Sequence, residues 1–141
     1  MNTIVKFGAL PVDHGDIAVE CVSTDEAGDL VYVRGDLDTE GRWRVERANC
    51  FDESKMPAVG IIVSKSSDTV GIMRRVGKID IFTGLDITKH YFVGQDGELQ
   101  EGAPTAPSGS VAVAQRIGIP LDPDVLWLTG EIGMLFKLVG F

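Results

Sequence analysis

The chain has 141 residues, of which 17 are glycine, and 13 Lys and Arg residues oppose 21 Asp and Glu residues for a formal net charge of −8. This length corresponds to one domain and is short for a two-domain cofactor enzyme. Apolar residues make up 44% of the chain, which excludes a disordered protein, and the many glycines exclude a protein of long helices. The acidic balance argues against binding to nucleic acid or to an anionic membrane, because such binding relies on clustered Lys and Arg.

The first segment of the chain, residues 1–16, differs from the rest. Ile4, Val5 and Phe7 alternate there with polar residues before the run is broken by glycine. The apolar run is too short for a secretory leader, and no stretch of the chain reaches the ~20 apolar residues that span a bilayer. We expect this segment to be either the first strand of the domain or an arm that adds a strand to a neighbour's sheet edge. Residues 17–141 then form a single β-rich domain.

Strand signals dominate after this segment. Runs of β-branched residues separated by polar turns predict strands at 17–22 and 30–34. Residues 43–47 alternate apolar and charged side chains, which is typical of a strand with one face in water. Residues 48–57 predict an irregular link with one helical turn, and the apolar run 58–63 begins the next strand.

A strand–turn–strand pattern follows and occurs twice. Its first copy covers the strand-like runs of residues 59–79, and its second covers those of residues 117–135. Each copy is entered through a glycine after a β-branched residue, Gly60 in the first and Gly118 in the second, and the first contains another at Gly77. Two copies predict a unit used twice in one barrel or sandwich, with the glycines permitting bulges or tight bends.

A hairpin and a loop lie between the two copies. Residues 91–93 predict a strand, and Asp96-Gly97 carries the signal of a tight hairpin turn. Residues 101–110, EGAPTAPSGS, predict a surface loop before strand signals resume at 111–116. The expected fold is therefore all-β with minor helix, a compact barrel-like domain with an extended N-terminal arm.

Motifs that carry catalysis are scarce. Asp13, His14 and Asp16 could supply carboxylates and an imidazole to a metal, but an exposed acidic turn is the better explanation of the cluster, because no second ligand motif accompanies it. Cys50 has no neighbouring cation that would stabilise a thiolate. We expect no catalytic residue, no metal and no cofactor. A small β-barrel enzyme that binds a metal or ligand through the acidic cluster is the alternative of another class.

Apolar side chains at surface positions are more informative. The last eight residues, MLFKLVGF, are strongly apolar, which predicts either a final core strand or part of an oligomer contact. Leu135, Phe136 and Phe141 are the candidate contact residues there. Trp43, in an alternating strand, is the predicted exposed aromatic anchor, whereas Trp127 is expected in the core.

Several short motifs in this order form a recognisable set. They are Gly28-Asp29-Leu30-Val31-Tyr32-Val33, Ala58-Val59-Gly60-Ile61, Gly77-Lys78-Ile79, Tyr91-Phe92-Val93-Gly94 with Gly97, and Ile117-Gly118-Ile119. With them, the segment from about residue 56 to residue 141 resembles the β-tulip-type domain of tailed-phage virion proteins, including lambda-type head-decoration (cement) proteins. The chain departs from the small lambda-type members in its longer N-terminal half.

The resemblance implies a non-enzymatic virion protein, made in the host cytoplasm, that binds the outer capsid lattice and stabilises the shell. Its partner would be the major capsid protein, and the protein would act as a homotrimer, with no nucleic-acid or membrane partner. Ile4, Val5 and Phe7 would form the capsid-binding arm, while Trp43 and the apolar C-terminal residues would pack between subunits. A tail or fibre-attachment component is the alternative, because the same module also occurs there.

Overall fold

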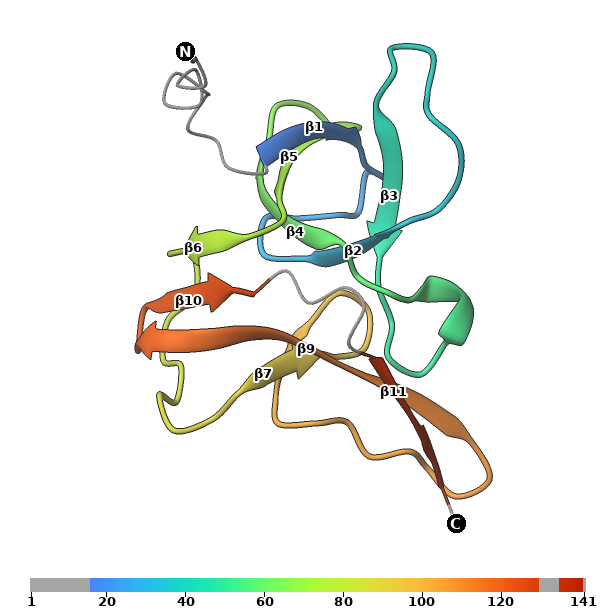
Figure 1. The fold of residues 1–141 in the computed structure, drawn as a ribbon. Coiled ribbons are helices and arrows are strands. Elements are labelled where there is room, and N and C mark those ends of the chain that lie inside the picture. Colours follow the sequence, from blue (N-terminus) through green and yellow to red (C-terminus); the bar gives the residue numbers. More distant parts are fainter. Residues whose placement is uncertain (1–15, 130–134, 141) are drawn as a thin grey trace, which may run out of the picture.

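The computed structural model describes residues 16–129 and 135–140, and nearly all the regular structure in them is β-strand. A closed barrel forms one layer, and a second sheet packs beneath it (Figure 1). The barrel-like, all-β fold predicted from the sequence is therefore confirmed. The elements are β1 (Asp16–Glu20), β2 (Leu30–Val33), β3 (Trp43–Arg47), the 3₁₀ turn η2 (Glu53–Lys55), β4 (Gly60–Lys65), β5 (Val70–Arg74), β6 (Gly77–Ile79), β7 (Tyr91–Val93), β8 (Leu99–Glu101), β9 (Val111–Asp122), β10 (Val125–Leu128) and β11 (Leu135–Val139).

The barrel is closed by its first strand. Around the barrel the order is β1-β3-β2-β4-β5, and β1 pairs with β3 in parallel and with β5 in antiparallel orientation. Closure gives each of the five strands a partner on both sides, although β1 meets β3 only at Val19 and Glu20, so little strand edge remains for pairing with another chain.

Two barrel strands bury side chains on both faces. In β2, Val31 points into the barrel and Leu30 points toward the second sheet; in β4, Ile62 and Ile61 divide in the same way. A strand that is covered on both faces reads as a continuous apolar run rather than an alternating one. In β3, by contrast, only Val45 is buried, because the outer face of that strand meets water. The sequences of β2 and β4 therefore place them between the two layers.

The second sheet has the order β6-β10-β9-β7-β8, with β11 added along β9. The repeated strand–turn–strand unit is divided between the layers, since β4 pairs with β5 in the barrel and β9 pairs with β10 in the second sheet. Gly118 permits close packing here, because a Cβ at this position would lie 2.8 Å from Cγ of Leu126. The glycine is thus a packing requirement of the core as well as a feature of an irregular strand.

The hairpin between β7 and β8 docks onto the barrel through its turn. Asp96 has φ 50° and Gly97 has φ 79°, the paired positive values that a two-residue hairpin turn requires. The Gly97 amide donates to the Ala48 carbonyl at 2.7 Å, and the Leu30 amide donates to the Gly97 carbonyl at 2.9 Å. The predicted Asp-Gly turn is therefore confirmed, and it also joins the two layers.

Gln115 makes a second joint between the layers. Its side chain is fully buried on β9, where its Oε1 accepts from the Ala58 amide and its Nε2 donates to the Ala58 carbonyl, both at 2.8 Å. The carboxamide thus makes the two hydrogen bonds to the Ala58 backbone that a neighbouring strand would otherwise make. Buried backbone groups without such a partner are costly to the folded state.

Replacement of this carboxamide by a hydrocarbon provides a test of the joint. Gln115→Leu would leave the amide and carbonyl of Ala58 buried without partners, so we expect the free energy of unfolding to fall by about 2–4 kcal/mol. Urea unfolding monitored by circular dichroism measures the change. Gln100→Leu is the matched control, because Gln100 is partly exposed and its side-chain Nε2 makes only a long hydrogen bond of 3.4 Å to the Gly102 carbonyl. A loss below about 1 kcal/mol for Gln115→Leu would contradict the assignment.

Candidate functional site

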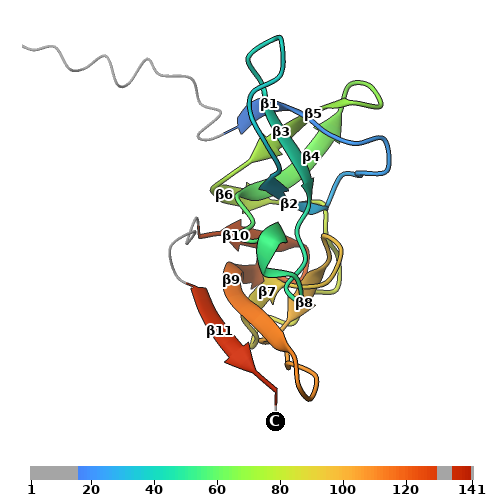
Figure 2. The same ribbon diagram turned by 90° about the vertical axis from the view of Figure 1, so that its right-hand side faces the viewer.

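Strand β11 is an apolar strand at the border of the second sheet. It pairs with β9 from Leu135 opposite Gln115 to Val139 opposite Val111, and within the described part of the chain it pairs with no other strand. Figure 2 shows it along one side of the lower layer. An open strand edge presents unpaired amides and carbonyls, and proteins usually protect such an edge with charges or a covering element.

The side chains of β11 are exposed on both faces. Leu135 is 37% exposed, Phe136 62% and Val139 56%. Lys137 is the one charged residue of the strand, and its Nζ lies 3.2 Å from Glu53 Oε1 with both side chains more than half exposed. Such an exposed ion pair contributes little to stability. The strand therefore carries apolar surface that the described part of the chain leaves uncovered.

One face of β11 borders an apolar groove of about 410 Å³. Phe136 lies opposite Ala114, and Leu138 lies opposite Ala112, so both side chains share the face of β9 that points away from the barrel. On this face a bend in the β7–β9 pairing places Phe92 opposite Arg116. The groove is lined by His90, Phe92, Ala103, Ala114, Arg116, Phe136 and Leu138.

The polar end of the groove is formed by two side chains. Nη1 of Arg116 lies 3.3 Å from Nδ1 of His90. Because a guanidinium only donates hydrogen bonds, this contact requires an unprotonated Nδ1 on the histidine. The groove thus combines aromatic and aliphatic walls with donor groups at one end, a composition typical of interaction surfaces.

The structure brings together two of the predicted interface residues. Leu135 and Phe136 are neighbours on β11 and are both exposed, so neither is a core residue of the described part of the chain. Lining residues such as Phe92 were not predicted, because the run Tyr91-Phe92-Val93 is apolar throughout and only its burial in the structure shows that Phe92 points away from the core. The other predicted residues Ile4, Val5, Phe7 and Phe141 lie outside the described residues.

Trp43 belongs to a different surface. It is 46% exposed at the start of β3, and it borders a hollow of about 220 Å³ on the barrel. The hollow shares no lining residue with the β11 groove, so the structure does not join Trp43 to the predicted C-terminal contact. Its other lining residues are Ile17, Val33, Val59, Met73 and Arg75.

Trp127 corrects a prediction. It was expected in the core but is 44% exposed, while its neighbours Leu126 and Leu128 are fully buried. The reason is the alternation of β10, whose one face packs in the core between the layers. On its outer face, Trp127 lies opposite Lys78 of β6 and Ile119 of β9.

The metal hypothesis finds no support in the described residues. Asp13 and His14 lie outside them, and Asp16 is taken by Arg74, whose Nε and Nη2 donate to its two carboxylate oxygens at 2.7 and 2.9 Å. Residues 16–129 and 135–140 contain no group of three or more His, Cys, Asp or Glu side chains placed to hold a metal ion. A bidentate arginine pair is instead a structural link between β1 and β5.

The two cysteines are buried and unpaired. Burial raises the pKa of the Cys50 thiol, and burial followed by the Asp25 charge raises the pKa of Cys21. The thiolate is the reactive form of cysteine. Both residues are therefore unsuited to nucleophilic chemistry.

Asp25 is a buried carboxylate in the loop between β1 and β2. It is 2% exposed, with Oδ2 accepting from the Val22 amide at 2.9 Å and Oδ1 lacking a partner. Lys65 stabilises this loop, because its Nζ lies 2.9 Å from the Asp25 carbonyl and near two further carbonyls. Burial is the main cause that raises the pKa of the Asp25 carboxyl; the nearby Asp29 raises it further, while Arg47 and Lys65 oppose the shift.

Comparison with known proteins does not assign the chain to a family. The chain shows no significant match to a protein-family model, to a characterised protein or to a solved structure. Among the described residues, no helix is long and apolar enough to cross a membrane.

The raised pKa of Asp25 has a consequence for acid stability. Because the folded state binds the Asp25 proton more tightly than the unfolded state, this residue favours folding at low pH, and that contribution is lost as pH rises through the raised pKa. We expect the wild-type protein to gain stability relative to Asp25→Asn as the pH falls from neutral to acidic values, by about 1.4 kcal/mol for each unit by which the pKa is raised. Urea unfolding at a series of pH values measures the difference.

Asp52 provides the matched control. Hydrogen bonds from the Ser54 hydroxyl and amide lower the pKa of its carboxyl, so wild-type protein should lose stability relative to Asp52→Asn on acidification. Parallel pH profiles for the two variants would contradict the assignment of Asp25.

Proposed function

We propose that this protein is a structural subunit that decorates the outer capsid lattice of a tailed phage and stabilises the shell. The observation that carries the proposal is β11, an open strand edge whose Leu135, Phe136 and Val139 are exposed. Exposed apolar side chains along an edge strand favour association with another protein surface. The resemblance of the sequence motifs to head-decoration proteins supplies the kind of assembly.

Self-association is the first part of the proposal. Three copies of the chain pack through β11 and its groove, so that each Phe136 leaves water and the open edges are covered. The C-terminal apolar residues hold the subunits together. The N-terminal arm, with Ile4, Val5 and Phe7, binds the capsid by strand addition. Binding to the assembled shell alone stabilises it by mass action.

The oligomer contact is tested by a change of charge on β11. Phe136→Asp would place a carboxylate where an apolar contact forms, so we expect the assembly of about three 15.2-kDa chains to dissociate to monomers. Light scattering after size exclusion measures the mass. Ile87→Asp is the matched control, because Ile87 is 60% exposed in the link before β7 and lies outside the groove.

Two results would overturn the contact. One is a wild-type protein that stays monomeric at the concentrations found in particle preparations. The other is an assembly that survives Phe136→Asp unchanged. Circular dichroism of the variant establishes that it remains folded.

Position on the particle is tested by imaging. Electron microscopy of virions labelled with antibody against this protein should place the label over the capsid surface, and labelling confined to the tail would favour the alternative of a tail component.

Deletion of residues 1–10 is expected to abolish binding to shells while the domain stays folded. A shell-binding assay and thermal unfolding of the truncated protein measure the two properties. Unchanged binding would exclude the arm.

A further inference from the structure

The charged groups of the described cations are nearly all engaged. The exceptions in residues 16–129 and 135–140 are Arg75, Lys78 and Lys89, whose charged groups make no ion pair and no hydrogen bond. Arg34, Arg42, Arg44, Arg47, Lys55, Arg74 and Lys137 form ion pairs with carboxylates, Lys65 lies against backbone carbonyls, and Arg116 contacts His90. In a chain with a net charge of −8, such unpaired cations are free to bind carboxylates of another molecule.

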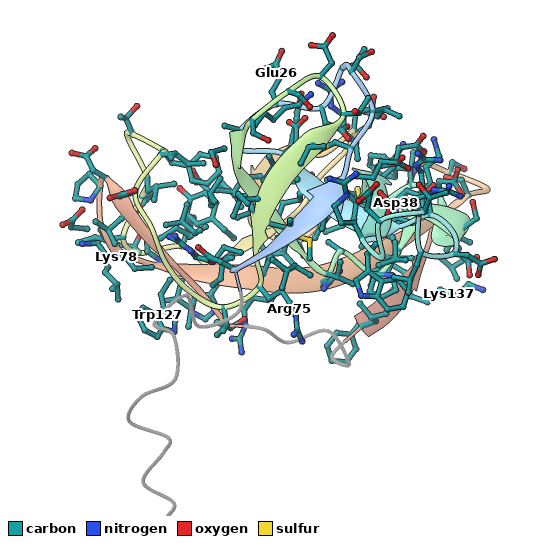
Figure 3. All side chains as sticks on the ribbon, turned by 90° about the horizontal axis from the view of Figure 1, so that it is seen from above. Glu26, Asp38, Arg75, Lys78, Trp127 and Lys137 are labelled. Carbon is teal, nitrogen blue, oxygen red and sulfur yellow. The ribbon has the colours of Figure 1, made fainter. Side chains whose placement is uncertain are left out.

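Two of these three cations lie close together. Arg75 lies in the link from the barrel to the second sheet and Lys78 lies three residues later in β6, so their backbones are at most about 10 Å apart. Both side chains therefore start from one short stretch of backbone, within reach of a single bound segment. Figure 3 shows Arg75 and Lys78 on the same side of the molecule, opposite Glu26.

Each of the two cations lies beside an exposed tryptophan side chain. Arg75 lines the hollow of about 220 Å³ that Trp43 borders, whose other walls are aliphatic side chains and Met73. Lys78 lies directly opposite Trp127 in the β6–β10 pairing, and Figure 3 shows the two side chains near one another. Exposed tryptophan and arginine are the residue types most enriched among the residues that dominate binding energy in protein interfaces.

We propose that Trp43, Arg75, Lys78 and Trp127 form a docking surface, here called the Trp–cation surface, for a short acidic segment of another protein. An apolar side chain of that segment enters the Trp43 hollow, and flanking carboxylates pair with Arg75 and Lys78. This surface is separate from the β11 groove, so the proposal does not depend on self-association through β11.

The size of the charged region favours a short segment over a long polyanion. Asp80 follows β6 directly, and Asp122 and Asp124 lie exposed at the turn between β9 and β10. A nucleic-acid strand that followed the Trp–cation surface would extend toward these carboxylates and be repelled, whereas a segment with two or three carboxylates can end before them. The acidic character of the rest of the molecule adds to this discrimination.

The two cations and the Trp43 hollow contribute to binding in different ways. Exposed ion pairs each contribute little affinity, so Arg75 and Lys78 mainly orient the segment and accelerate its encounter. Burial of an apolar side chain in the Trp43 hollow supplies most of the binding free energy. A ligand that lacks either the carboxylates or the apolar side chain should therefore bind weakly.

Fluorescence anisotropy with a labelled peptide tests the proposal. The probe is GDLEFDG, and its controls are GNLQFNG, which lacks the charges, and GDSESDG, which lacks the apolar side chains. We expect GDLEFDG to bind, with affinity that falls on addition of salt, and each control peptide to bind about tenfold more weakly. No binding of GDLEFDG at millimolar protein would overturn the proposal.

Variants locate the binding site on the protein. Arg75→Gln and Lys78→Gln should each weaken binding about threefold, and Trp43→Ser about tenfold or more. Lys89→Gln is the matched control, because Lys89 is also unpaired but lies in the link between β6 and β7, away from the hollow. Thermal unfolding of each variant checks the fold, and the two Gln variants test the surface even if Trp43→Ser unfolds.

Two further results would overturn the proposal. One is a loss of affinity as large for Lys89→Gln as for the Arg75 and Lys78 variants. The other is tighter binding of an oligothymidylate probe than of GDLEFDG, which would assign the surface to single-stranded nucleic acid instead.

Discussion

The apolar character of β2 and β4 on both faces is the constraint on which the two-layer arrangement depends. Leu30 and Ile61 belong to the core between the layers, while Val31 and Ile62 fill the barrel. Neither strand could be exposed without uncovering apolar surface, so the second sheet must cover the barrel on this side. The Gly97 turn and the carboxamide of Gln115 then fix the position of that sheet by hydrogen bonds to barrel backbone.

This arrangement leaves one face and one edge for contacts with other molecules. The barrel leaves little free strand edge, and the inner face of the second sheet is used by the core. The outer face of that sheet and the edge of β11 carry the surplus apolar surface, with Phe136 at one end and Trp127 at the other. The second sheet thus presents the apolar edge of β11, and the Trp–cation surface extends from Trp127 and Lys78 of this sheet to Trp43 and Arg75 beside the barrel.

Local patterns were sufficient for the strands but not for their partners. β-Branched runs and the Asp96-Gly97 signal predicted strand positions and a hairpin because these depend on neighbouring residues. Closure of the barrel through the parallel β1–β3 pair, and the bond between Gln115 and Ala58 at a separation of 57 residues, depend on distant parts of the chain. Trp127 was wrongly assigned to the core because its apolar neighbours concealed the alternation of β10, and the outer face of that strand was not anticipated.

The burial of both cysteines makes the protein suitable for distance measurements in an assembly. Cys21 and Cys50 are the only cysteines of the chain, and each is at most 2% exposed. Thiol reagents attack the thiolate of an accessible cysteine, so the native thiols should react slowly while the protein is folded. A cysteine introduced at an exposed position outside the β11 groove, such as Ile87, would therefore carry a spin label or dye selectively. Distances between labelled chains could then be measured without removal of the native cysteines.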